Sequence, residues 1–500
     1  MPLPTTDAFA PLALQGQGPI YRQLYERVRA AIAAGTLQPG ARIPSARALA
    51  KELGVARGTI EVAYELLAAE GYLLARGQAG TVVNPALQPS ASASNAPAPA
   101  AQGNAPGVET TAPLASAAHP TTALPAPSPP RDTLWRPPQL LPFQMGLPAL
   151  DAFPRKIWAR LGARYLRGMQ AADLDYPAPH GLPALRSAIA SYLQIARGID
   201  CGAHQVFVTT GWRHSLQLAV LALLQPGDQA WVEDPGYPPT RQLLRESGLN
   251  IVAVPVDADG MDVAHGIALA PHARLATVTP AHQSPLSMSL SLPRRQALLD
   301  WAAASGAWVM EDDYDGEYRY ASRPLPALAS LDQHGRVLYG GSFSKVLFPG
   351  IRLAYLVVPS AQVAAFERAG RVFFAAATPA ITQAVVASFM AEGHFSRHIQ
   401  RMRKLYAERR SATLAALEKG LGGQLRAEPQ PGGMHLIVRL PMPGSDRPLA
   451  ERLLAHGMAV QPLSPWWASE RNDAAILLSF TNYTTTAQAE QLGRLIREAL

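Results

Sequence analysis

A short run that ends in a lysine carries the residues best suited to covalent chemistry. Ser342, Ser344 and Lys345 close the run Gly340-Gly341-Ser342-Phe343-Ser344-Lys345, and Arg352 follows seven positions later. Only five of the 44 Lys and Arg residues are lysines, so lysine is rare in this chain and its presence in this run is informative. An amine can capture an aldehyde, while hydroxyls and a guanidinium can hold a phosphate. The run points to pyridoxal 5'-phosphate, although taken alone it fits a surface lysine after a polar turn equally well.

The acidic segment Glu311-Asp312-Asp313-Tyr314-Asp315-Gly316-Glu317-Tyr318 allows two interpretations. The first is a calcium loop, because carboxylates and a glycine stand where an EF-hand has them at positions 1, 3, 5 and 6. That interpretation fails further on, since position 12 would be Ser322 and an apolar strand precedes the segment, and we expect no metal site. In the second, Asp312 pairs with a protonated pyridine nitrogen and Tyr314 donates to the ring's phenolic oxygen.

Two more candidates for holding a phosphorylated ring follow predicted strands. Gly211 and Trp212 lie in Thr210-Gly211-Trp212-Arg213, which opens a helix whose first N–H groups and dipole can receive a phosphate. Such glycine turns are structural more often than functional. Tyr237 could stack on a flat ring, and a core tyrosine is an equally good interpretation.

The elements that must position these residues alternate short apolar runs with helical stretches after Leu134. This order is typical of an α/β fold with a mainly parallel sheet, where ligands bind near the carboxyl ends of strands. A helix is expected over 213–224. The predicted strands are 206–208, 229–232, 275–278, 308–310, 337–339 and 353–358.

The first 84 residues have a different organisation, typical of a winged helix-turn-helix. Apolar residues at helical spacing predict a first helix, and Ser45 is a good N-cap for a second helix over 46–53. Gly54 makes a turn, and Arg57 opens a third helix whose apolar face is formed by Ile60, Ala63, Tyr64 and Leu67. Residues 73–76 and 81–83 flank a glycine-containing tip at 77–80, as expected of a wing.

A third helix of this kind fits the major groove of double-stranded DNA with its N-terminal residues facing the bases. Arg57 and Thr59 occupy those positions, and Ser45 and Arg47 would reach phosphate or base. With Gly80 of the wing, these residues form the predicted DNA-binding set. A three-helix protein-interaction module is the alternative.

Composition sets limits without deciding function. The net charge of +7 and a pI near 9.5 permit nucleic-acid binding. No long apolar run or signal-peptide pattern is present, so we expect a cytoplasmic protein without a membrane span. Cys201 is the single cysteine and receives no role.

A segment rich in Pro, Ala and Ser separates the two patterns. Between Pro85 and Pro130 the only Asp, Glu, Lys or Arg is Glu109, so the segment cannot build a core and is expected to be a flexible tether, although a structured proline-rich cap is possible. The expected domains are therefore a DNA-binding domain over 1–84, a linker over 85–134 and a cofactor-binding domain over 135–500.

Residues 19–84 resemble the winged helix of GntR-type bacterial regulators. The matching motifs are Pro39-Gly40-Ala41-Arg42-Ile43-Pro44-Ser45, Gly54-Val55-Ala56-Arg57 and Ala69-Glu70-Gly71-Tyr72. Glu61 departs from relatives with a basic residue there, which leaves the operator sequence open. From about Leu140 onward the chain resembles fold-type I, aspartate-aminotransferase-like enzymes, and the whole chain resembles MocR/GabR-type regulators.

The resemblance implies specific roles for the candidate residues. The lysine that matches Lys345 forms an internal aldimine with the cofactor, Asp312 meets the pyridine nitrogen, and Tyr176 reaches the phosphate of the neighbouring subunit. Ser342, Arg352 and the turn at Gly211 and Trp212 hold the phosphate in such proteins. A head-to-tail homodimer is therefore implied, typically with each DNA-binding head crossing to the partner.

Two departures from the enzyme pattern matter. Residues 279–287 match a loop that usually ends in glycine, but Ser287 stands there, and the ring contact is left open between His282 and Gln283. Aminotransferases place an arginine for the substrate carboxylate on the strand matched by residues 474–480, and no arginine precedes Ile476 there. Arg471 is the nearest, so ordinary amino-acid transamination is harder to support.

Three functions compete at this stage. The leading hypothesis is a transcriptional regulator in which the aldimine on Lys345, or its adduct with an amine effector, modulates promoter binding. The effector would be a small amine, an amino acid or pyridoxal 5'-phosphate itself. The second is an active aminotransferase with an auxiliary DNA-binding head. The third is a DNA-binding protein whose enzyme-like half only dimerises.

Overall fold

The computed structural model describes ten stretches of the chain and divides it into two compact units. The described residues are 20–33, 36–69, 72–75, 80–85, 140–320, 326–372, 378–428, 432–469, 473–482 and 485–499. Most of the predicted linker and residues 76–79 of the predicted wing lie outside them. We describe the N-terminal head and the large domain separately.

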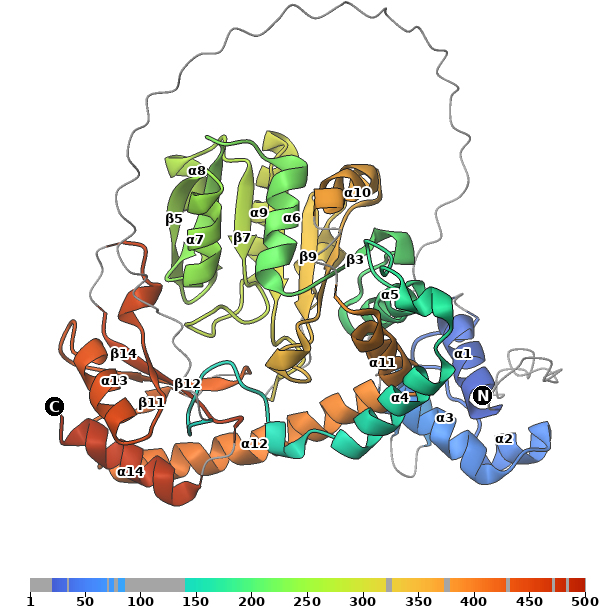
Figure 1. Cartoon of the computed structure of the whole chain (residues 1–500). Coiled ribbons are helices and arrows are strands. Elements are labelled where there is room, and N and C mark those ends of the chain that lie inside the picture. Colours follow the sequence, from blue (N-terminus) through green and yellow to red (C-terminus); the bar gives the residue numbers. More distant parts are fainter. Residues whose placement is uncertain are drawn as a thin grey trace, which may run out of the picture. The chain divides into compact units, whose positions relative to one another are not determined.

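The described residues of the head form three helices, labelled α1 to α3 in Figure 1, and a two-stranded ribbon. The elements are α1 (Ile20–Ala33), α2 (Ala46–Leu53), α3 (Arg57–Ala69), β1 (Leu73–Ala75) and β2 (Thr81–Val83). Ser45 caps α2 by accepting from the Ala48 N–H at 3.2 Å, and Gly54 ends α2 in the left-handed conformation with φ 66°. The predicted apolar face of α3 is buried at Ile60, Ala63 and Leu67. The winged helix-turn-helix is confirmed.

An eight-stranded sheet forms the centre of the large domain. Its order is β3-β10-β9-β8-β7-β4-β5-β6, and β10 and β6 run antiparallel to their neighbours. The strands are β3 (Val206–Thr209), β4 (Gln229–Asp234), β5 (Asn250–Asp257), β6 (Gly260–Met261), β7 (Leu275–Val278), β8 (Trp308–Asp313), β9 (Val337–Ser342) and β10 (Ala354–Val357). All six predicted strands are confirmed. Four run further than predicted, β3 to Thr209, β4 to Asp234, β8 to Asp313 and β9 to Ser342, and β10 is one residue shorter at each end.

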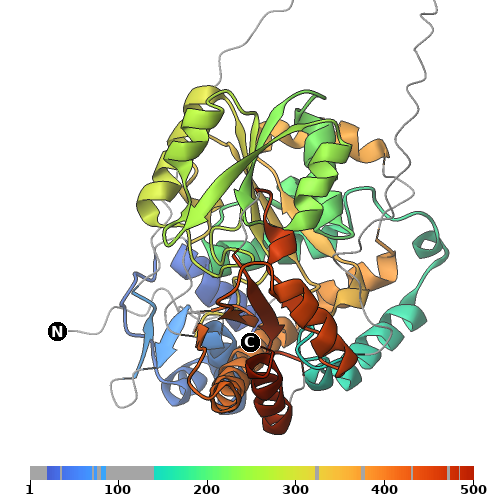
Figure 2. The same ribbon diagram turned by 90° about the vertical axis from the view of Figure 1, so that its left-hand side faces the viewer.

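Helices cover both faces of this sheet (Figure 2) because alternate strand residues are apolar on both sides. On one face lie α6 (Trp212–Leu223), α7 (Pro238–Glu246) and α10 (Val363–Gly370). On the other lie α8 (Val263–Leu269) and α9 (Leu292–Ser305). The carboxyl ends of β3, β4, β7, β8 and β9 therefore meet at one edge, where ligands bind in sheets of this kind.

The remaining elements build a helical flank and a smaller sheet. The flank consists of α4 (Arg155–Gly168), α5 (Pro183–Arg197), α11 (Ala380–Ala391) and the first turns of α12 (His394–Leu421). The smaller sheet has the order β11-β12-β14-β13, with β11 (Ala427–Glu428), β12 (His435–Arg439), β13 (Gln461–Pro462) and β14 (Ala475–Ser479). Helices α13 (Asp446–Ala455) and α14 (Thr486–Arg497) complete it.

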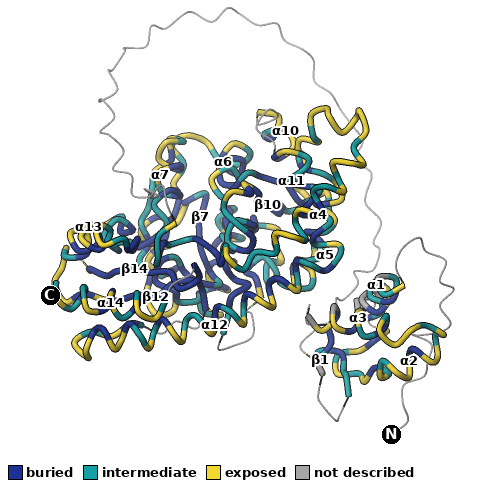
Figure 3. Tube along the Cα trace, turned by 60° about the horizontal axis from the view of Figure 1, so that its bottom comes forward, coloured by how far each residue is buried: buried dark blue, intermediate teal, exposed yellow. Residues whose placement is uncertain are grey.

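Burial follows this layered arrangement (Figure 3). The inner strands of both sheets are buried, the edge strand β13 and most of β5 are partly exposed, and the helices keep an exposed outer face. Among the described helices, none is long and apolar enough to cross a bilayer.

Candidate functional site

The candidate residues of the large domain gather at the carboxyl edge of the central sheet. Gly211 follows β3, Tyr237 follows β4, and Asp312 lies near the end of β8. Ser342 ends β9 and Lys345 follows in the next turn. Parallel strands thus bring together residues that are more than 130 positions apart in the sequence.

Lys345 reaches across to a glycine that the sequence interpretation missed. Its Nζ donates to the carbonyl oxygen of Gly146 at 3.0 Å. A Cβ atom at Gly146 would lie 2.5 Å from that Nζ, and the φ of Gly146 is 76°. Only glycine satisfies both conditions comfortably. The available signal was its place before Leu147-Pro148, where a glycine and a proline mark a turn.

The turn before α6 and Arg352 form a cradle for an anion. Gly211 is the N-cap of α6, and a Cβ atom on it would lie 3.3 Å from Nη2 of Arg352. Arg352 itself has a left-handed backbone with φ 49°, which turns its exposed guanidinium toward this helix end. The first N–H groups of α6, the helix dipole and a guanidinium therefore converge on one point.

Ser342 and Ser344 lie beside this cradle in the turn that carries Lys345. The Ser342 hydroxyl accepts from the Ser344 N–H at 3.1 Å, which stabilises the turn. The indole of Trp212 points elsewhere, because its Nε1 donates to Thr240 Oγ1 at 2.8 Å and its ring packs against Gly340. Trp212 can therefore contribute its backbone N–H to the site, and its indole does not take part.

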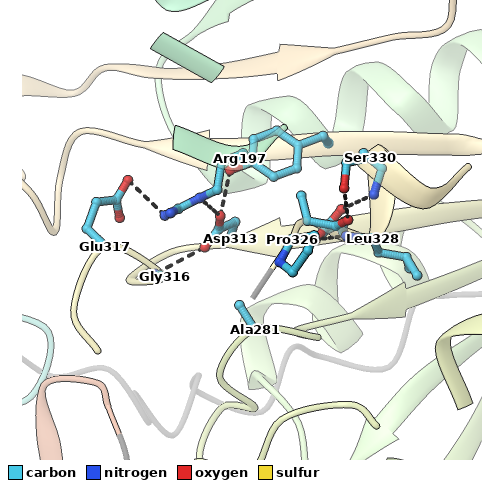
Figure 4. Close-up of polar contacts among 12 residues, drawn as sticks. Arg197, Ala281, Asp313, Gly316, Glu317, Pro326, Leu328 and Ser330 are labelled. Atoms are coloured by element: carbon cyan, nitrogen blue, oxygen red, sulfur yellow. Dashed lines mark hydrogen bonds and ion pairs between the residues drawn. The ribbon is translucent and has the colours of Figure 1, made fainter. Parts of the chain in front are cut away.

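The carboxylates of the acidic segment diverge instead of surrounding a cation. Asp313 accepts from Arg197 Nε at 2.6 Å, and Arg197 also pairs with Glu317 at 3.2 Å (Figure 4). Glu311 accepts from the N–H groups of Leu328 and Ala329 at 2.9 and 2.8 Å. These carboxylates therefore join the segment to α5, through Arg197, and to the backbone of residues 328–329.

Asp312 is the member of the segment that faces the site. Its side chain is half-buried. Burial, reinforced by Asp313, Glu233 and Asp315, raises the pKa of Asp312 well above its usual range, and the positive charge of Lys345 opposes this. A carboxylate in such surroundings is stabilised by a further cation, which is what a protonated pyridine nitrogen would provide.

Tyr314 and His282 are brought together, and Gln283 is directed away from them. His282 Nδ1 lies 2.9 Å from the Tyr314 hydroxyl. Gln283 is buried, its Nε2 donates to Pro235 O at 2.8 Å, and its Oε1 accepts from the Leu286 N–H at 2.8 Å. We therefore assign Gln283 to shaping the loop.

The end of that loop has a backbone conformation that favours glycine. Ser287 has a φ of 69°, in the left-handed region that disfavours side chains. Its hydroxyl lies 3.2 Å from Nε2 of His435, which also lies 2.8 Å from Pro285 O. These polar contacts offset part of the strain. Burial lowers the pKa of His435 to about 4, so this imidazole is neutral near pH 7.

Tyr237 borders a buried apolar cluster. Tyr237 packs at a centroid distance of 5.9 Å from Trp466, next to a buried cluster that includes Leu286, Trp467 and Leu477. Leu477 is fully buried within β14, the strand on which aminotransferases carry the carboxylate-binding arginine. Arg471, the nearest arginine in the sequence, lies outside the described residues.

Tyr176 lies on the connection between η4 (Ala171–Leu174) and α5, and 71% of it is exposed. Its predicted contact is with a second subunit, so this exposure is what a single chain should show.

In the head, Ser45, Arg47 and Arg57 are exposed at the starts of α2 and α3, and Thr59 is partly exposed. Gly80 has a φ of 87°, and a Cβ atom there would lie 3.1 Å from Nε of Arg42. Arg42 was missed by the sequence interpretation. Its backbone bridges to Val82, so its guanidinium lies over the wing, where a cation can meet DNA phosphate.

These residues fit pyridoxal 5'-phosphate by the character of their donors. The anion cradle could bind the phosphate, and Asp312 would be stabilised by a protonated ring nitrogen. Lys345 has the amine that could react with the aldehyde. Tyr314 and Tyr237 supply a hydroxyl and an aromatic face.

Comparison with known proteins gives matches for both units. The family described as "Bacterial regulatory proteins, gntR family" matches residues 20–83, and "Aminotransferase class I and II" matches residues 149–473. The chain is 36% identical over 478 residues to the probable rhizopine catabolism regulatory protein MocR of Rhizobium meliloti, covering 95% of this chain and 93% of that protein. It is 35% identical over 506 residues to the HTH-type transcriptional regulator TauR of Rhodobacter capsulatus, covering 99% of each. The crystal structure of the kynurenine aminotransferase of Pyrococcus horikoshii aligns with a TM-score of 0.66 at 27% identity, over 72% of this chain and 90% of that chain.

Proposed function

Because the chain belongs to the MocR-type regulators, which join a GntR-family head to an aminotransferase-like domain, we propose that it is a pyridoxal-phosphate-dependent transcriptional regulator. The head, residues 1–84, would bind operator DNA. Residues 85–134 would link it to a domain over 135–500 that holds the cofactor on Lys345. Binding of the cofactor, or of an amine that reacts with it, would change operator affinity.

The convergence of Lys345, Asp312 and the Gly211–Arg352 cradle carries this proposal. When bound, pyridoxal phosphate supplies an aldehyde for a primary amine and an electron-poor ring. The chain's residues would do the holding. Arg352 and the start of α6 would bind the phosphate, Asp312 would keep the ring nitrogen protonated, and Lys345 would bind covalently.

The apolar surroundings of Tyr237 and Leu477 favour sensing over turnover. An α-carboxylate that enters an apolar site needs a cationic partner, and the described part of β14 carries none. An effector could still react through its amine. Tyr176 is exposed in the single chain, as expected of a residue that would contact a partner subunit. This exposure supports a homodimer as the functional unit.

The decisive measurement is operator affinity as a function of cofactor. Fluorescence polarisation with labelled DNA from the region upstream of the gene would compare wild type, Lys345→Ala and the control Lys404→Ala, which removes an exposed lysine of α12. We expect the cofactor to change wild-type and Lys404→Ala affinity by about fivefold or more, as is typical of allosteric coupling, and to leave Lys345→Ala unaffected. An equal response of wild type and Lys345→Ala would contradict sensing through this lysine.

Turnover as an aminotransferase is the second candidate, favoured by the structural likeness to a kynurenine aminotransferase over most of that enzyme. Conversion of an amino donor and a keto acceptor in large excess over protein would distinguish the two. We expect at most one equivalent of product per subunit. Sustained turnover would make the enzyme activity primary.

A further inference from the structure

We propose that a stripe of basic residues on α4 binds the phosphate backbone of the DNA that flanks the operator. The inference rests on the proposed function, because the head must first bring the duplex to the large domain. It adds a second DNA contact, independent of base sequence, on the domain that would hold the cofactor.

The basic stripe consists of Lys156, Arg160, Arg164 and Arg167. Their spacing of four, four and three residues places them on one face of α4, because an α-helix repeats every 3.6 residues. All four are exposed, and α4 keeps an exposed outer face in Figure 3. At 1.5 Å per residue, the stripe is about 16 Å long.

The opposite face of α4 fixes the stripe at the surface. Leu161 is fully buried, and Ile157 and Trp158 pack against the same cluster of the helical flank. The Trp158 ring meets Phe389 of α11 edge to face at a centroid distance of 5.9 Å. A helix that buries its apolar face in this way turns its charged face outward. The stripe is therefore held in place by core packing.

The positive charge of α4 is mostly uncompensated. The net charge of the whole chain is +7, and α4 alone carries +5 because it has five basic residues and no acidic one. Like charges four residues apart destabilise a helix. Among the described residues, Glu392 is the carboxylate that pairs with the stripe, and it does so at Arg164. A bound polyanion would relieve the remaining repulsion.

The exposed cations continue from α4 to the start of α12. Nε2 of His394 lies 3.4 Å from Nη2 of Arg160, and its Nδ1 lies 2.9 Å from Nη2 of Arg397. Burial, followed by the positive charge of Arg397, lowers the pKa of His394, while Glu392 opposes this. Because the imidazole is neutral near pH 7, the charge of this surface belongs to lysine and arginine side chains. These keep their charge over the whole physiological pH range.

Double-stranded DNA is the polyanion that fits this surface. One strand advances about 3.4 Å along the duplex axis per phosphate, so a stripe about 16 Å long can face several phosphates. Lysine and arginine bind phosphates without reading the bases. Once the head has bound its operator, the flanking DNA is held near the large domain of the same chain, which raises its effective concentration. An acidic protein in solution has no such link to the chain.

The test compares full-length wild type with the double variant Lys156→Gln/Arg167→Gln, which leaves the ion pair between Arg164 and Glu392 intact. The matched control, Arg447→Gln/Arg452→Gln, removes the same charge from exposed positions of α13. Fluorescence polarisation with cofactor present would use two duplexes. The short duplex is the shortest upstream fragment that wild type binds specifically, and the long duplex extends it by about two helical turns, roughly 20 base pairs, on each side.

On the long duplex, at about 150 mM salt, we expect the α4 variant to bind about tenfold or more weakly than wild type, because two phosphate contacts are lost. The slope of log affinity against log salt concentration should become shallower by about two. On the short duplex the α4 variant should bind like wild type, and the control should match wild type on both duplexes.

Equal losses of affinity on the two duplexes, or an equal loss in the control, would overturn the proposal. Unchanged binding of the α4 variant to the long duplex would also overturn it and would leave an acidic protein as the partner of the stripe. Dissociation of the dimer in that variant, measured by sedimentation, would assign the stripe to a subunit interface instead. If wild type binds neither duplex, it is the proposed function that fails.

Discussion

Gly146 shapes the site because it lacks a side chain. A Cβ atom would lie 2.5 Å from Lys345 Nζ, and the backbone has a φ of 76°. We expect Gly146→Ala to lower affinity for pyridoxal 5'-phosphate about tenfold or more, because the lysine must move from its place. Gly444→Ala is a matched control, since its φ is 74° with no atom within 4 Å. It should cost about 1 kcal/mol of backbone strain and leave cofactor affinity unchanged in a spectroscopic titration. Equal cofactor affinity in both variants would contradict this role for Gly146.

The sequence could predict those candidate residues whose chemistry lies in the side chain. Lys345 and Asp312 could be identified by type and by order along the chain, and both come to one edge of the sheet. Gly146 could not, because its contact with Lys345 joins segments 199 positions apart and depends on a missing side chain. Likewise, nothing local showed that Arg197 would hold Asp313 and leave Asp312 facing the site.

At the scale of elements, the capping of α2 can be separated from contact with DNA. Ser45 accepts from the Ala48 N–H at 3.2 Å, so Ser45→Ala should destabilise α2 by about 1 kcal/mol. Hydrogen exchange of the α2 amides in the full-length chain would show this as faster exchange, and Ser45→Asn should restore slow exchange because asparagine caps equally well. If Ser45 also contacts DNA, Ser45→Asn should still bind operator more weakly. Full recovery of binding would reduce its role to capping.

The end of β4 and the 279–287 loop are joined by a buried carboxylate that titrates near neutral pH. Glu233 accepts from Thr279 Oγ1 at 2.6 Å, and burial raises the pKa of Glu233 to about 7. The folded state therefore binds the proton more tightly than the unfolded chain, so stability falls as the pH rises from about 4.5 to about 7.

Glu233→Gln removes this titration. We expect the free energy of unfolding of Glu233→Gln, relative to that of wild type, to rise by on the order of 1–3 kcal/mol from pH 5 to pH 8. The difference in melting temperature between the two proteins at each pH measures this rise. The exposed Glu451→Gln variant on α13 should show no such trend. Parallel curves for wild type and Glu233→Gln would contradict the raised pKa.

Strand ends could be predicted where the strand consists of apolar residues. They were predicted too early where polar residues continue the strand. The interpretation ended a strand at Met310, whereas β8 runs to Asp313, because pairing with β9 continues through Asp312 and Asp313. Polar residues at a strand end look like a loop in sequence. In a parallel sheet, ligands bind at the carboxyl ends of the strands, so polar residues at those ends can contact a ligand.

At the scale of the whole molecule, a site completed by a second subunit would couple cofactor binding to dimer assembly. Tyr176 is 71% exposed in the single chain, and we propose that it reaches the phosphate held by the partner's cradle. Tyr176→Phe should then lower cofactor affinity about tenfold, as loss of a hydrogen bond to a charged group does. Dimers would also be stabilised by the cofactor, which sedimentation can follow.

Mixed dimers test this sharing directly. A subunit with Lys345→Ala but intact Tyr176 should complete the site of a partner that carries Tyr176→Phe and intact Lys345. In a randomly assembled equal mixture, half of the dimers are mixed and each contains one complete site, so about a quarter of all sites should bind with wild-type affinity. If Tyr176 acted within its own subunit, no site in the mixture would contain both groups, and the titration would lack a wild-type phase. If each variant is crosslinked as a homodimer before the two are mixed, the subunits can no longer share sites. The titration should then also lack the wild-type phase.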